Sequence, residues 1–477
     1  MATFERTTQL VVLGAGPGGY AAAFMAADLG MEVTLVNREV NPGGVCLYRG
    51  CIPSKALLHA AKVINEAHEA ATYGVTFGTP QIDLDKLRGW KESVVDRLTG
   101  GLGHMTKQRK VTYLQGEGTL RDAHQLDVTL SNGDQGVVKF EKMILATGSR
   151  PIFPAIFNIG SPLVMDSTAA LELKDCPQRL LVVGGGYIGL ELSCVYAALG
   201  SQVTVVEATP ALLPGADRDL VQVLQKSIQP KMSRVMLNTK VMQLKEVGQQ
   251  VEVTLQMPSG ESVQENFDRV LISIGRRPNT ESVGLEHTKI EVDGRGFVKI
   301  DSQGRTHEPN IFAIGDISGD PMLAHRATHQ GRVAAEALHG SKATFEPRAI
   351  PAVVFTDPEL AWAGLTEQQC KDQNIQHSVA KFPWAASGRA LTLNQPSGLT
   401  KMIIDPEDGR LLGLGIVGSG AGELIAEGVL ALEMGALAED VGLCIHAHPT
   451  LSETVMESAD VFFGTSTHIY KPKRQPV

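Results

Sequence analysis

Short apolar runs and a glycine-rich turn follow one another near the start of the chain. Residues 9–39, QLVVLGAGPGGYAAAFMAADLGMEVTLVNRE, begin with an apolar run, pass through the turn into an alanine-rich segment that ends at Gly30, and close with a β-branched run. Short apolar and β-branched runs are typical of buried strands, and a longer alanine-rich run is typical of a helix. The stretch predicts a β-α-β unit with a right-handed crossover and a parallel sheet.

The same pattern returns at 179–209, RLLVVGGGYIGLELSCVYAALGSQVTVVEAT. Each copy carries a G-x-G-x-x-G motif between its first strand and its helix. In this motif the first glycine permits the tight turn, the second lets the backbone approach a pyrophosphate, and the third lets the helix pack on the strand. We therefore expect two dinucleotide sites with phosphates at the helix N-termini. The motif glycines are Gly14, Gly16 and Gly19, then Gly184, Gly186 and Gly189.

The residue that would bind an adenosine ribose differs between the copies. About 20 positions after the turn, this unit usually carries an acidic residue, and the second copy has Glu207 there. A carboxylate favours a 2′-hydroxyl and repels a 2′-phosphate, so the second site is predicted to bind NAD(H) rather than NADP(H). The first copy has Asn37 at this offset, which can hydrogen-bond a ribose without the charge; Glu39 can substitute for it if the loop bends back.

Composition and charge narrow the class of protein. The chain has 477 residues, of which 43% are hydrophobic and 20% charged, as in an ordinary soluble protein of several domains. No apolar run is long enough to cross a bilayer and no signal peptide is apparent, so we expect a cytoplasmic protein. A net charge of -9 without a long basic run does not indicate a surface that binds nucleic acid. The basic segment 471–474 is interpreted as a solvated tail.

Two cysteines five positions apart, Cys46 and Cys51, lie in GGVCLYRGCIPSKALL at 43–58. They can be unrelated buried thiols, half of a zinc site, or a redox-active dithiol. A structural disulfide framework is not expected from six cysteines in a reducing compartment, and zinc would need a second Cys or His pair that is not apparent. No metal site is predicted. Four further cysteines are expected to be small buried hydrophobes: Cys176, Cys194, Cys370 and Cys444.

The spacing of this pair does not suit a regular helix. Residues five apart on an α-helix have Cα atoms about 8.6 Å apart, whereas a disulfide needs less than about 7 Å. The segment CLYRGC must therefore be distorted, and Gly50 supplies the backbone freedom. We predict a strained, reducible bridge.

Dithiol chemistry also needs a base, because the thiolate is the attacking species. His448, in HAHPTLSE at 446–453, is the candidate. Glu453 lies five residues later, close enough to orient the imidazole and raise its basicity. His446 is interpreted as structural.

The dithiol segment resembles the active-site signature of the class I pyridine nucleotide-disulfide oxidoreductases, and within that family its dihydrolipoamide-oxidising members. The resemblance continues in further stretches along the chain, namely ILATGSRP at 144–151, SIGRRPNT at 273–280, IFAIGD at 311–316, PMLAH at 321–325 and HAHPTLSE. It implies an α/β fold of two Rossmann-like dinucleotide-binding domains plus an α+β dimerisation domain. The implied regions are an FAD domain at 1–150, an NAD domain at 151–275, a central domain at 276–347 that completes the FAD site, and a dimerisation domain at 348–477.

The resemblance also implies roles for single residues. Lys55 is expected near the flavin N5 with Glu191 as its partner, and Asp316 is expected to hydrogen-bond the ribityl chain of FAD. His448 would reach the disulfide of the other subunit of a homodimer. Further cofactor contacts are expected at Gly148, Gly275, Met322, Ala324 and His325.

The activity implied by the resemblance is oxidation of protein-bound dihydrolipoamide with reduction of NAD+ to NADH. The enzyme would serve as the E3 component of 2-oxoacid dehydrogenase or glycine cleavage complexes, and its partners would be lipoylated domains of the E2 or H-protein type. Cys46 is expected to face the substrate and Cys51 the flavin.

Related enzymes each lack support at a defined place. Glu207 argues against NADPH-dependent glutathione and trypanothione reductases, and mercuric reductase and large thioredoxin reductases carry a C-terminal cysteine pair that this chain does not have. Soluble transhydrogenase does not keep both cysteines, and an inactive assembly subunit would not need them. Two positions depart from the signature, Tyr48 and Arg49, where an asparagine and an apolar residue are more common. Arg49 would favour a thiolate if it points toward the cysteines.

Overall fold

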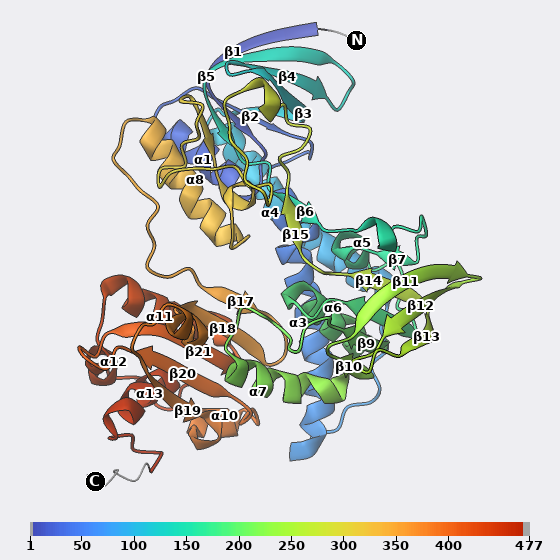
Figure 1. The fold of residues 1–477 in the computed structure, drawn as a ribbon, viewed down its shortest axis with the longest axis vertical. Coiled ribbons are helices and arrows are strands. Elements are labelled where there is room, and N and C mark those ends of the chain that lie inside the picture. The colour runs from blue at the N-terminus through green and yellow to red at the C-terminus, as the bar shows by residue number, and fades with distance from the viewer. Residues whose placement is uncertain (1–2, 471–477) are drawn as a thin grey trace.

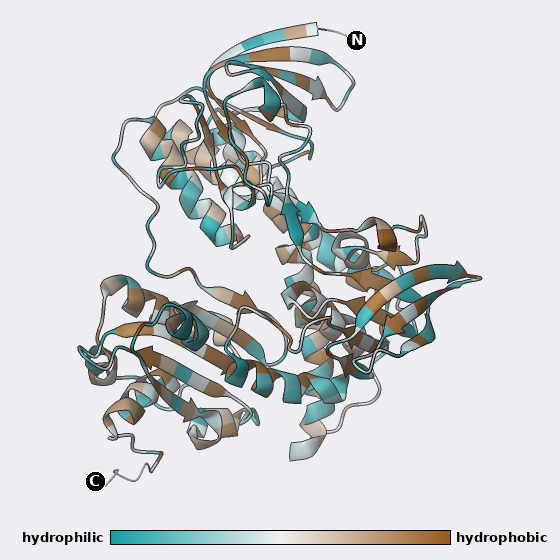
Figure 2. Ribbon diagram, viewed as in Figure 1, coloured by the Kyte–Doolittle hydropathy of each residue, from teal (hydrophilic) through white to brown (hydrophobic). Residues whose placement is uncertain are grey.

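The computed structural model describes residues 3–470, which fold around three large sheets (Figure 1). The first part of the chain lies at the top of Figure 1, the middle part at the right and the last part at the lower left. Apolar residues, brown in Figure 2, concentrate on the strands. The basic segment 471–474 lies outside the described residues. Within residues 3–470, no helix is both long enough and apolar enough to span a membrane.

The first sheet contains the β-α-β unit expected at 9–39. Its parallel strands pair in the order β3-β2-β1-β5-β16. These strands are β1 (Thr3–Leu13), β2 (Val33–Asn37), β3 (Thr112–Asp122), β5 (Gln135–Leu145) and β16 (Ile311–Ala313). The first strand begins at Thr3 rather than near residue 9, because it pairs with β5 from Thr3 onward. The antiparallel strand β4 (Gln125–Leu130) joins β3 to β5.

The helices around this sheet carry the dithiol and a late segment of the chain. Helix α1 (Pro17–Asp28) packs against α8 (Ala324–Leu338), far away in sequence. The dithiol segment forms α2 (Gly44–Arg49) and α3 (Cys51–Glu69), and α4 (Leu84–Gln108) packs beside both. Helix α3 runs down toward the second sheet (Figure 1). The redox segment therefore bridges the first two parts of the molecule.

The second sheet repeats the plan of the first. Its parallel strands pair in the order β10-β9-β8-β14-β7. These strands are β7 (Val164–Met165), β8 (Arg179–Val183), β9 (Gln202–Val206), β10 (Arg234–Met236) and β14 (Arg269–Ile272). An antiparallel meander follows, formed by β11 (Lys240–Val247), β12 (Gln250–Gln256) and β13 (Ser262–Phe267). The helices of this part are α5 (Ser167–Leu171), α6 (Tyr187–Ala198) and α7 (Arg218–Ile228).

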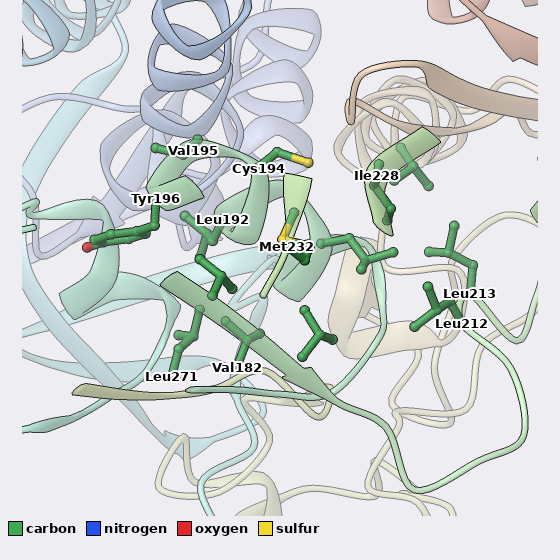
Figure 3. Close-up of a cluster of buried hydrophobic side chains, with 14 of the residues drawn as sticks. Val182, Leu192, Cys194, Val195, Tyr196, Leu212, Leu213, Ile228, Met232 and Leu271 are labelled. Atoms are coloured by element: carbon green, nitrogen blue, oxygen red, sulfur yellow. The ribbon is translucent and has the colours of Figure 1, made fainter. Parts of the chain in front are cut away.

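The core of the second part lies between its sheet and α6. Figure 3 shows Val182 and Leu271 of the sheet beside Leu192 of the helix, all of them buried. Tyr196 is also buried and donates its hydroxyl to the Ala170 carbonyl at 2.8 Å. Two Rossmann-like units are thus confirmed, each with the glycine turn at its central strand.

Residues 276–347 do not form a sheet of their own. Strand β15 (Arg276–Pro278) pairs antiparallel with β6 (Ser149–Pro151) where the chain crosses between the two Rossmann-like parts. Strand β16 then joins the edge of the first sheet, and α8 covers α1. This segment therefore completes the first part, while the domain limits near 150, 275 and 347 stay predictions.

The last part is an antiparallel sheet with helices on its faces. Its order is β17-β18-β21-β20-β19. The strands are β17 (Ala352–Val354), β18 (Glu359–Gly364), β19 (Ser378–Pro383), β20 (Leu399–Ile404) and β21 (Leu411–Gly418). Helix α11 (Ala421–Met434) packs on β18 and β21, and α13 (Glu453–Phe463) packs on β19 and β20. Shorter helices are α9 (Glu367–Asp372), α10 (Gly388–Thr392) and α12 (Ala438–Leu443). The predicted α+β character of this region is confirmed.

Candidate active site

Two cavities adjoin the two glycine turns. The first has a volume of about 580 Å³ and contains both Cys46 and Cys51 in its wall. The second has a volume of about 940 Å³ and lies over the second turn and Glu207. Tyr187, Ile188, Arg276 and Met322 line both cavities. The two candidate cofactor sites are therefore neighbours that share a wall.

The first and third glycines of each motif are required by the backbone. Gly14 has φ +98° and Gly184 has φ +108°, a left-handed conformation that favours glycine. A Cβ atom at Gly19 would lie 1.9 Å from the Gly14 carbonyl oxygen, and one at Gly189 would lie 2.2 Å from the Gly184 oxygen. No larger residue fits these helix-to-turn contacts.

The second glycines open onto the cavities. A Cβ at Gly16 or Gly186 would meet no atom within 4 Å, and both residues line their cavity. Each is the N-cap of its helix, and neither helix has a side-chain cap. The first backbone N–H groups of α1 and α6 are thus left for an anion. This geometry fits the pyrophosphates of FAD and NAD.

Asn37 and Glu207 occupy corresponding positions in the two units. Asn37 Oδ1 lies 3.4 Å from the Ala15 N–H, and Glu207 Oε2 lies 2.7 Å from the Gly185 N–H, each inside a glycine motif. The other Glu207 oxygen accepts from the Thr209 N–H at 2.8 Å. The carboxylate is therefore held rigidly beside the second cavity, which suits a ribose with a free 2′-hydroxyl.

The dithiol segment is broken at Gly50, as the cysteine spacing predicts. Cys46 lies on α2, Gly50 separates the helices, and Cys51 begins α3. A Cβ at Gly50 would lie 2.9 Å from the Val45 carbonyl oxygen, so the break requires glycine. Both cysteines are free thiols in this structure, and the expected bridge is not formed.

The two thiols differ in their acidity. The hydrogen bond with Cys46 lowers the pKa of Cys51 to about 7; burial opposes this shift, and the charge of Lys55 adds to it. The same hydrogen bond and burial raise the pKa of Cys46. Cys51 is thus the more acidic thiol of the reduced pair, and Cys46 is the hydrogen-bond donor.

Lys55 and Glu191 meet beside Cys51, as the resemblance implies. The Nζ of Lys55 lies 2.8 Å from Oε2 of Glu191, which is only 3% exposed. Both residues line the first cavity. Lys55 comes from α3 and Glu191 from α6, so the ion pair joins the two Rossmann-like parts.

The departures from the signature have structural partners. Arg49 forms an ion pair with Glu39 on the wall of the first cavity, and it is not among the main causes of the pKa shift of either cysteine. The hydroxyl of Tyr48 donates to the Asn41 carbonyl at 3.1 Å and accepts from the Asn41 N–H at 3.2 Å. Arg49 therefore points toward Glu39, and Tyr48 anchors the preceding loop.

Asp316 also lies in the wall of the first cavity. Ser149 donates its hydroxyl to Asp316 Oδ2 at 2.5 Å, and Arg276 donates to the same hydroxyl oxygen at 2.8 Å. Gly148 and Gly275, on either side of the β6–β15 crossing, have positive φ angles of +70° and +131°. Gly148 lines the first cavity and Gly275 the second.

The residues of the PMLAH segment differ in their surroundings: some line the cavities, and one bonds a nearby backbone segment of the same chain. Met322 lines both cavities and Ala324 lines the first. His325 lines neither of them: its Nε2 donates to the Pro351 carbonyl at 2.8 Å, and burial lowers its pKa. The expected cofactor contact at His325 therefore stays a prediction.

His448 and Glu453 form the expected pair. His448 Nδ1 lies 2.9 Å from Glu453 Oε1, and Glu453 Oε2 accepts from the Thr450 N–H at 2.7 Å. Because a carboxylate can only accept, Nδ1 carries the proton and Nε2 stays available as a base. The His448 side chain is 73% exposed, and neither His448 nor Glu453 lines a cavity with the dithiol of the same chain.

His446 has a structural environment, as expected. Its ring is 7% exposed and bonds the Cys444 carbonyl and Glu427. Cys444 itself is exposed, so its prediction as a buried hydrophobe is wrong: the segment after α12 turns its side chains outward. Cys194 and Cys370 are buried and Cys176 is partly buried. The described residues contain no cluster of His, Cys, Asp or Glu that could hold a metal.

Several residues of the two cavities were not identified from the sequence. Tyr187 and Arg276 lie in the shared wall, and Trp362 comes to the second cavity from the last part of the chain. Tyr187 lies inside the second glycine motif, directly after Gly186, which was an available signal. Trp362 lies on an ordinary strand, so nothing in its local pattern indicates a site.

Known families and proteins are similar to this chain along almost its whole length. Residues 8–331 match the family model pyridine nucleotide-disulphide oxidoreductase, and residues 350–459 match the dimerisation domain of the same family. Proteins named dihydrolipoyl dehydrogenase are similar in sequence. The one from Vibrio cholerae is 48% identical, with 98% of each chain covered, and the one from Bacillus subtilis is 44% identical, with 98% of this chain and 99% of that one covered.

Solved structures agree with these matches. LpdA from Mycobacterium tuberculosis has a TM-score of 0.87 at 26% identity, covering 95% of this chain and 99% of that one. The HOCl-induced flavoprotein disulfide reductase RclA from Escherichia coli, solved as a Cu(II) complex, has a TM-score of 0.85 at 29% identity, covering 95% of this chain and 99% of that one.

Proposed function

Because this chain belongs to the pyridine nucleotide-disulphide oxidoreductase family, we propose that it oxidises protein-bound dihydrolipoyl groups and reduces NAD+ at the dithiol of Cys46 and Cys51. It is a flavin disulfide oxidoreductase that uses FAD and NAD. The observation that carries the assignment is the paired thiols in the wall of the first cavity, with Cys51 acidified beside Lys55. The name shared by the sequence relatives supports dihydrolipoyl substrates.

Each cavity would hold one of the two cofactors. FAD would be held by the glycine turn at 14–19, by Asn37, and by the residues Gly148, Asp316, Met322 and Ala324, all of which line the first cavity. NAD would be held by the turn at 184–189, by Glu207 and by Gly275 at the second cavity. The FAD domain would consist of residues 1–150 together with residues 276–347. The NAD domain would be residues 151–275, and the dimerisation domain would be residues 348–477.

The protein residues carry the thiol chemistry. His448 removes a proton from one substrate thiol, whose sulfur attacks Cys46 of the oxidised Cys46–Cys51 bridge, so that the S–S bond breaks and Cys51 leaves as a thiolate. The second substrate thiol then attacks its own mixed-disulfide sulfur and releases Cys46 as a thiol. The substrate loses two electrons, the enzyme dithiol gains them, and His448 holds a proton. FAD, when bound at the first cavity, would supply the two-electron chemistry that links this dithiol to NAD+.

A second copy of the chain is needed to complete this site. The exposed His448 does not line the cavity that contains the dithiol of its own chain. The dimerisation domain spans 350–459 and includes His448 and Glu453. We propose a homodimer in which each His448 serves the dithiol of the other subunit.

The wider setting follows from the chemistry. A dithiol that oxidises lipoyl arms would serve a 2-oxoacid dehydrogenase or glycine cleavage complex, where the partner is a lipoylated domain of the E2 or H-protein type. We place the enzyme in the cytoplasm.

The test is to mix the FAD-loaded dimer with dihydrolipoamide and follow NADH formation, with NADP+ in a parallel reaction. We expect rapid turnover with NAD+ and weak turnover with NADP+. Repeating the assay with a lipoylated H-protein and with a lipoyl domain of the E2 type compares the two partner classes. Fast reduction of glutathione disulfide without dihydrolipoamide turnover would contradict the proposal and favour a disulfide reductase.

A further inference from the structure

The carboxylate of Glu191 is held from two sides. It is buried, and its Oε2 accepts from Lys55 Nζ at 2.8 Å. Its Oε1 accepts from the backbone N–H of Phe355 at 3.0 Å. Phe355 directly follows β17 in the last part of the chain, whereas Glu191 belongs to the second part and Lys55 to the first. Three parts of the molecule therefore meet at one buried carboxylate.

The ring of Phe355 covers the other partner of this ion pair. Lys55 Nζ lies 4.4 Å from the ring centroid, within the range of a cation–π interaction. The ammonium group thus contacts both the Glu191 carboxylate and an aromatic face. Because a lysine side chain has many rotamers, two such contacts restrict where its charge lies.

The turn that carries Phe355 is itself anchored. Thr356 donates its hydroxyl to the Pro358 carbonyl at 2.8 Å, and Asp357 accepts from Lys231 at 3.0 Å. Lys231 also lies 3.5 Å from Glu69, at the end of α3. The turn that carries Phe355 is therefore tied, through Lys231, to the helix that carries Cys51 and Lys55.

We propose that Phe355 is a positioning residue for Lys55, holding its ammonium group where it stabilises the Cys51 thiolate. The ring fixes the cation, and the backbone N–H fixes the carboxylate that pairs with it. Val353 and Val354, immediately before it, line the second cavity, so one edge of the last sheet contributes to the NAD site and orients the charge beside the dithiol. The proposal rests on the proposed roles of Cys51 and Lys55.

The sign of the effect follows from the charges. The positive charge of Lys55 lowers the pKa of Cys51, whereas the negative charge of Glu191, which the Phe355 N–H holds in place, raises it. Without the ring, the ammonium group gains rotamer freedom and solvent, and its field at Cys51 weakens. The pKa of Cys51 then rises. A rise of about one unit means about tenfold less thiolate at a pH below the midpoint.

The experiment compares Phe355→Leu and Phe355→Met with the wild-type holoenzyme after anaerobic reduction of the dithiol. Alkylation of Cys51 by iodoacetamide is measured against pH by peptide mass spectrometry. Both variants keep the backbone N–H and an apolar side chain, and Met is the second choice if Leu does not fold. Phe355→Tyr keeps the aromatic face. Phe345→Leu makes the same chemical change at a partly exposed site that lines neither cavity.

We expect the pH midpoint of Cys51 alkylation to rise by about one pH unit in the Leu and Met variants. The alkylation rate at pH 6 then falls about tenfold. The Tyr variant and Phe345→Leu keep the wild-type midpoint. An unchanged midpoint in Phe355→Leu or Phe355→Met overturns the proposal, as does an equal rise in Phe345→Leu. Because the readout requires no turnover, its outcome is independent of whether dihydrolipoamide is the substrate.

Discussion

Glu453 bonds His448 with one carboxylate oxygen and the backbone of Thr450 with the other. Oε1 lies 2.9 Å from His448 Nδ1, while Oε2 accepts from the Thr450 N–H at 2.7 Å. Burial raises the pKa of Glu453, but the Thr450 and His448 contacts outweigh it and leave the pKa lowered. The carboxylate thus stays charged through the neutral range and keeps the proton of His448 on Nδ1. The ring nitrogen left free is the one that can act as a base.

The first prediction concerns this pair. His448→Gln should lower kcat by about 10²–10⁴-fold, the usual contribution of a general base. Glu453→Gln should lower it less, because the base remains but loses its orienting charge. Steady-state kinetics measure both effects. His446→Gln is the matched control, since His446 is held by Glu427. Normal turnover in His448→Gln would remove this residue from the mechanism.

A second prediction concerns the dithiol. Cys46→Ser and Cys51→Ser should each abolish dihydrolipoamide turnover while FAD remains bound, because neither serine can form the bridge. The pKa of Cys51 is lowered to about 7 by its hydrogen bond with Cys46. Cys46→Ser keeps a hydroxyl that can donate to Cys51, so the Cys51 thiolate should still form near neutral pH, as measured by alkylation rates. Cys370→Ser changes a buried thiol that lines neither cavity and should keep full activity.

Much of the site could be predicted because its signals are local. The glycine motifs, Glu207 and the break at Gly50 follow from spacings of fewer than about 25 residues within one β-α-β unit. The direction of Arg49 could not be predicted, since it depends on how the loop carrying Glu39 folds back toward α2. Phe355 and Trp362 reach the site only through the packing of the last part against the other two. Their local sequence reads as ordinary strand, and only the tertiary structure places them.

A third prediction follows from the Arg49–Glu39 pair. Arg49→Met should leave the pH midpoint of Cys51 alkylation nearly unchanged, because the Arg49 charge is paired with Glu39 and is not among the main causes of the Cys51 pKa shift. Lys55→Met should raise that midpoint. The same alkylation titration compares the two variants. If Arg49→Met raised this midpoint as much as Lys55→Met does, the charge of Arg49 would act directly on the dithiol.

A fourth prediction concerns the choice of nicotinamide cofactor. Glu207 accepts from two backbone N–H groups of its own unit, so its carboxylate is fixed at the edge of the second cavity. Glu207→Gln removes the charge and keeps the shape. We expect KM for NAD+ to rise by about tenfold, as for the loss of one charge-assisted hydrogen bond, and the preference over NADP+ to fall. Glu261→Gln, on the exposed meander, is the control, and an unchanged preference would exclude Glu207 from ribose recognition.

The last prediction concerns the ion pairs that join the second and last parts. Lys401 is 1% exposed, and its Nζ lies 3.0 Å from Asp217, 3.1 Å from Asp219 and 2.7 Å from Glu367. Hydrogen bonds from Lys371 and Lys401 lower the pKa of Glu367 to about 2. Lys401→Met leaves these carboxylates without their shared cation and should reduce the free energy of unfolding at pH 7 by about 3 kcal/mol.

The pH dependence separates this loss of charge pairing from a loss of packing. A carboxylate with a lowered native pKa stabilises the fold above its unfolded pKa near 4.5, and this stabilisation is lost as the pH falls toward 2. Urea unfolding of the holoenzyme at several pH values should therefore show wild type and Lys401→Met converging between about pH 4.5 and 2. Lys371→Met removes a more exposed partner of Glu367 and should cost much less at neutral pH. A difference between Lys401→Met and wild type that persisted unchanged at pH 3 would mean that Lys401 stabilises the interface through packing rather than charge.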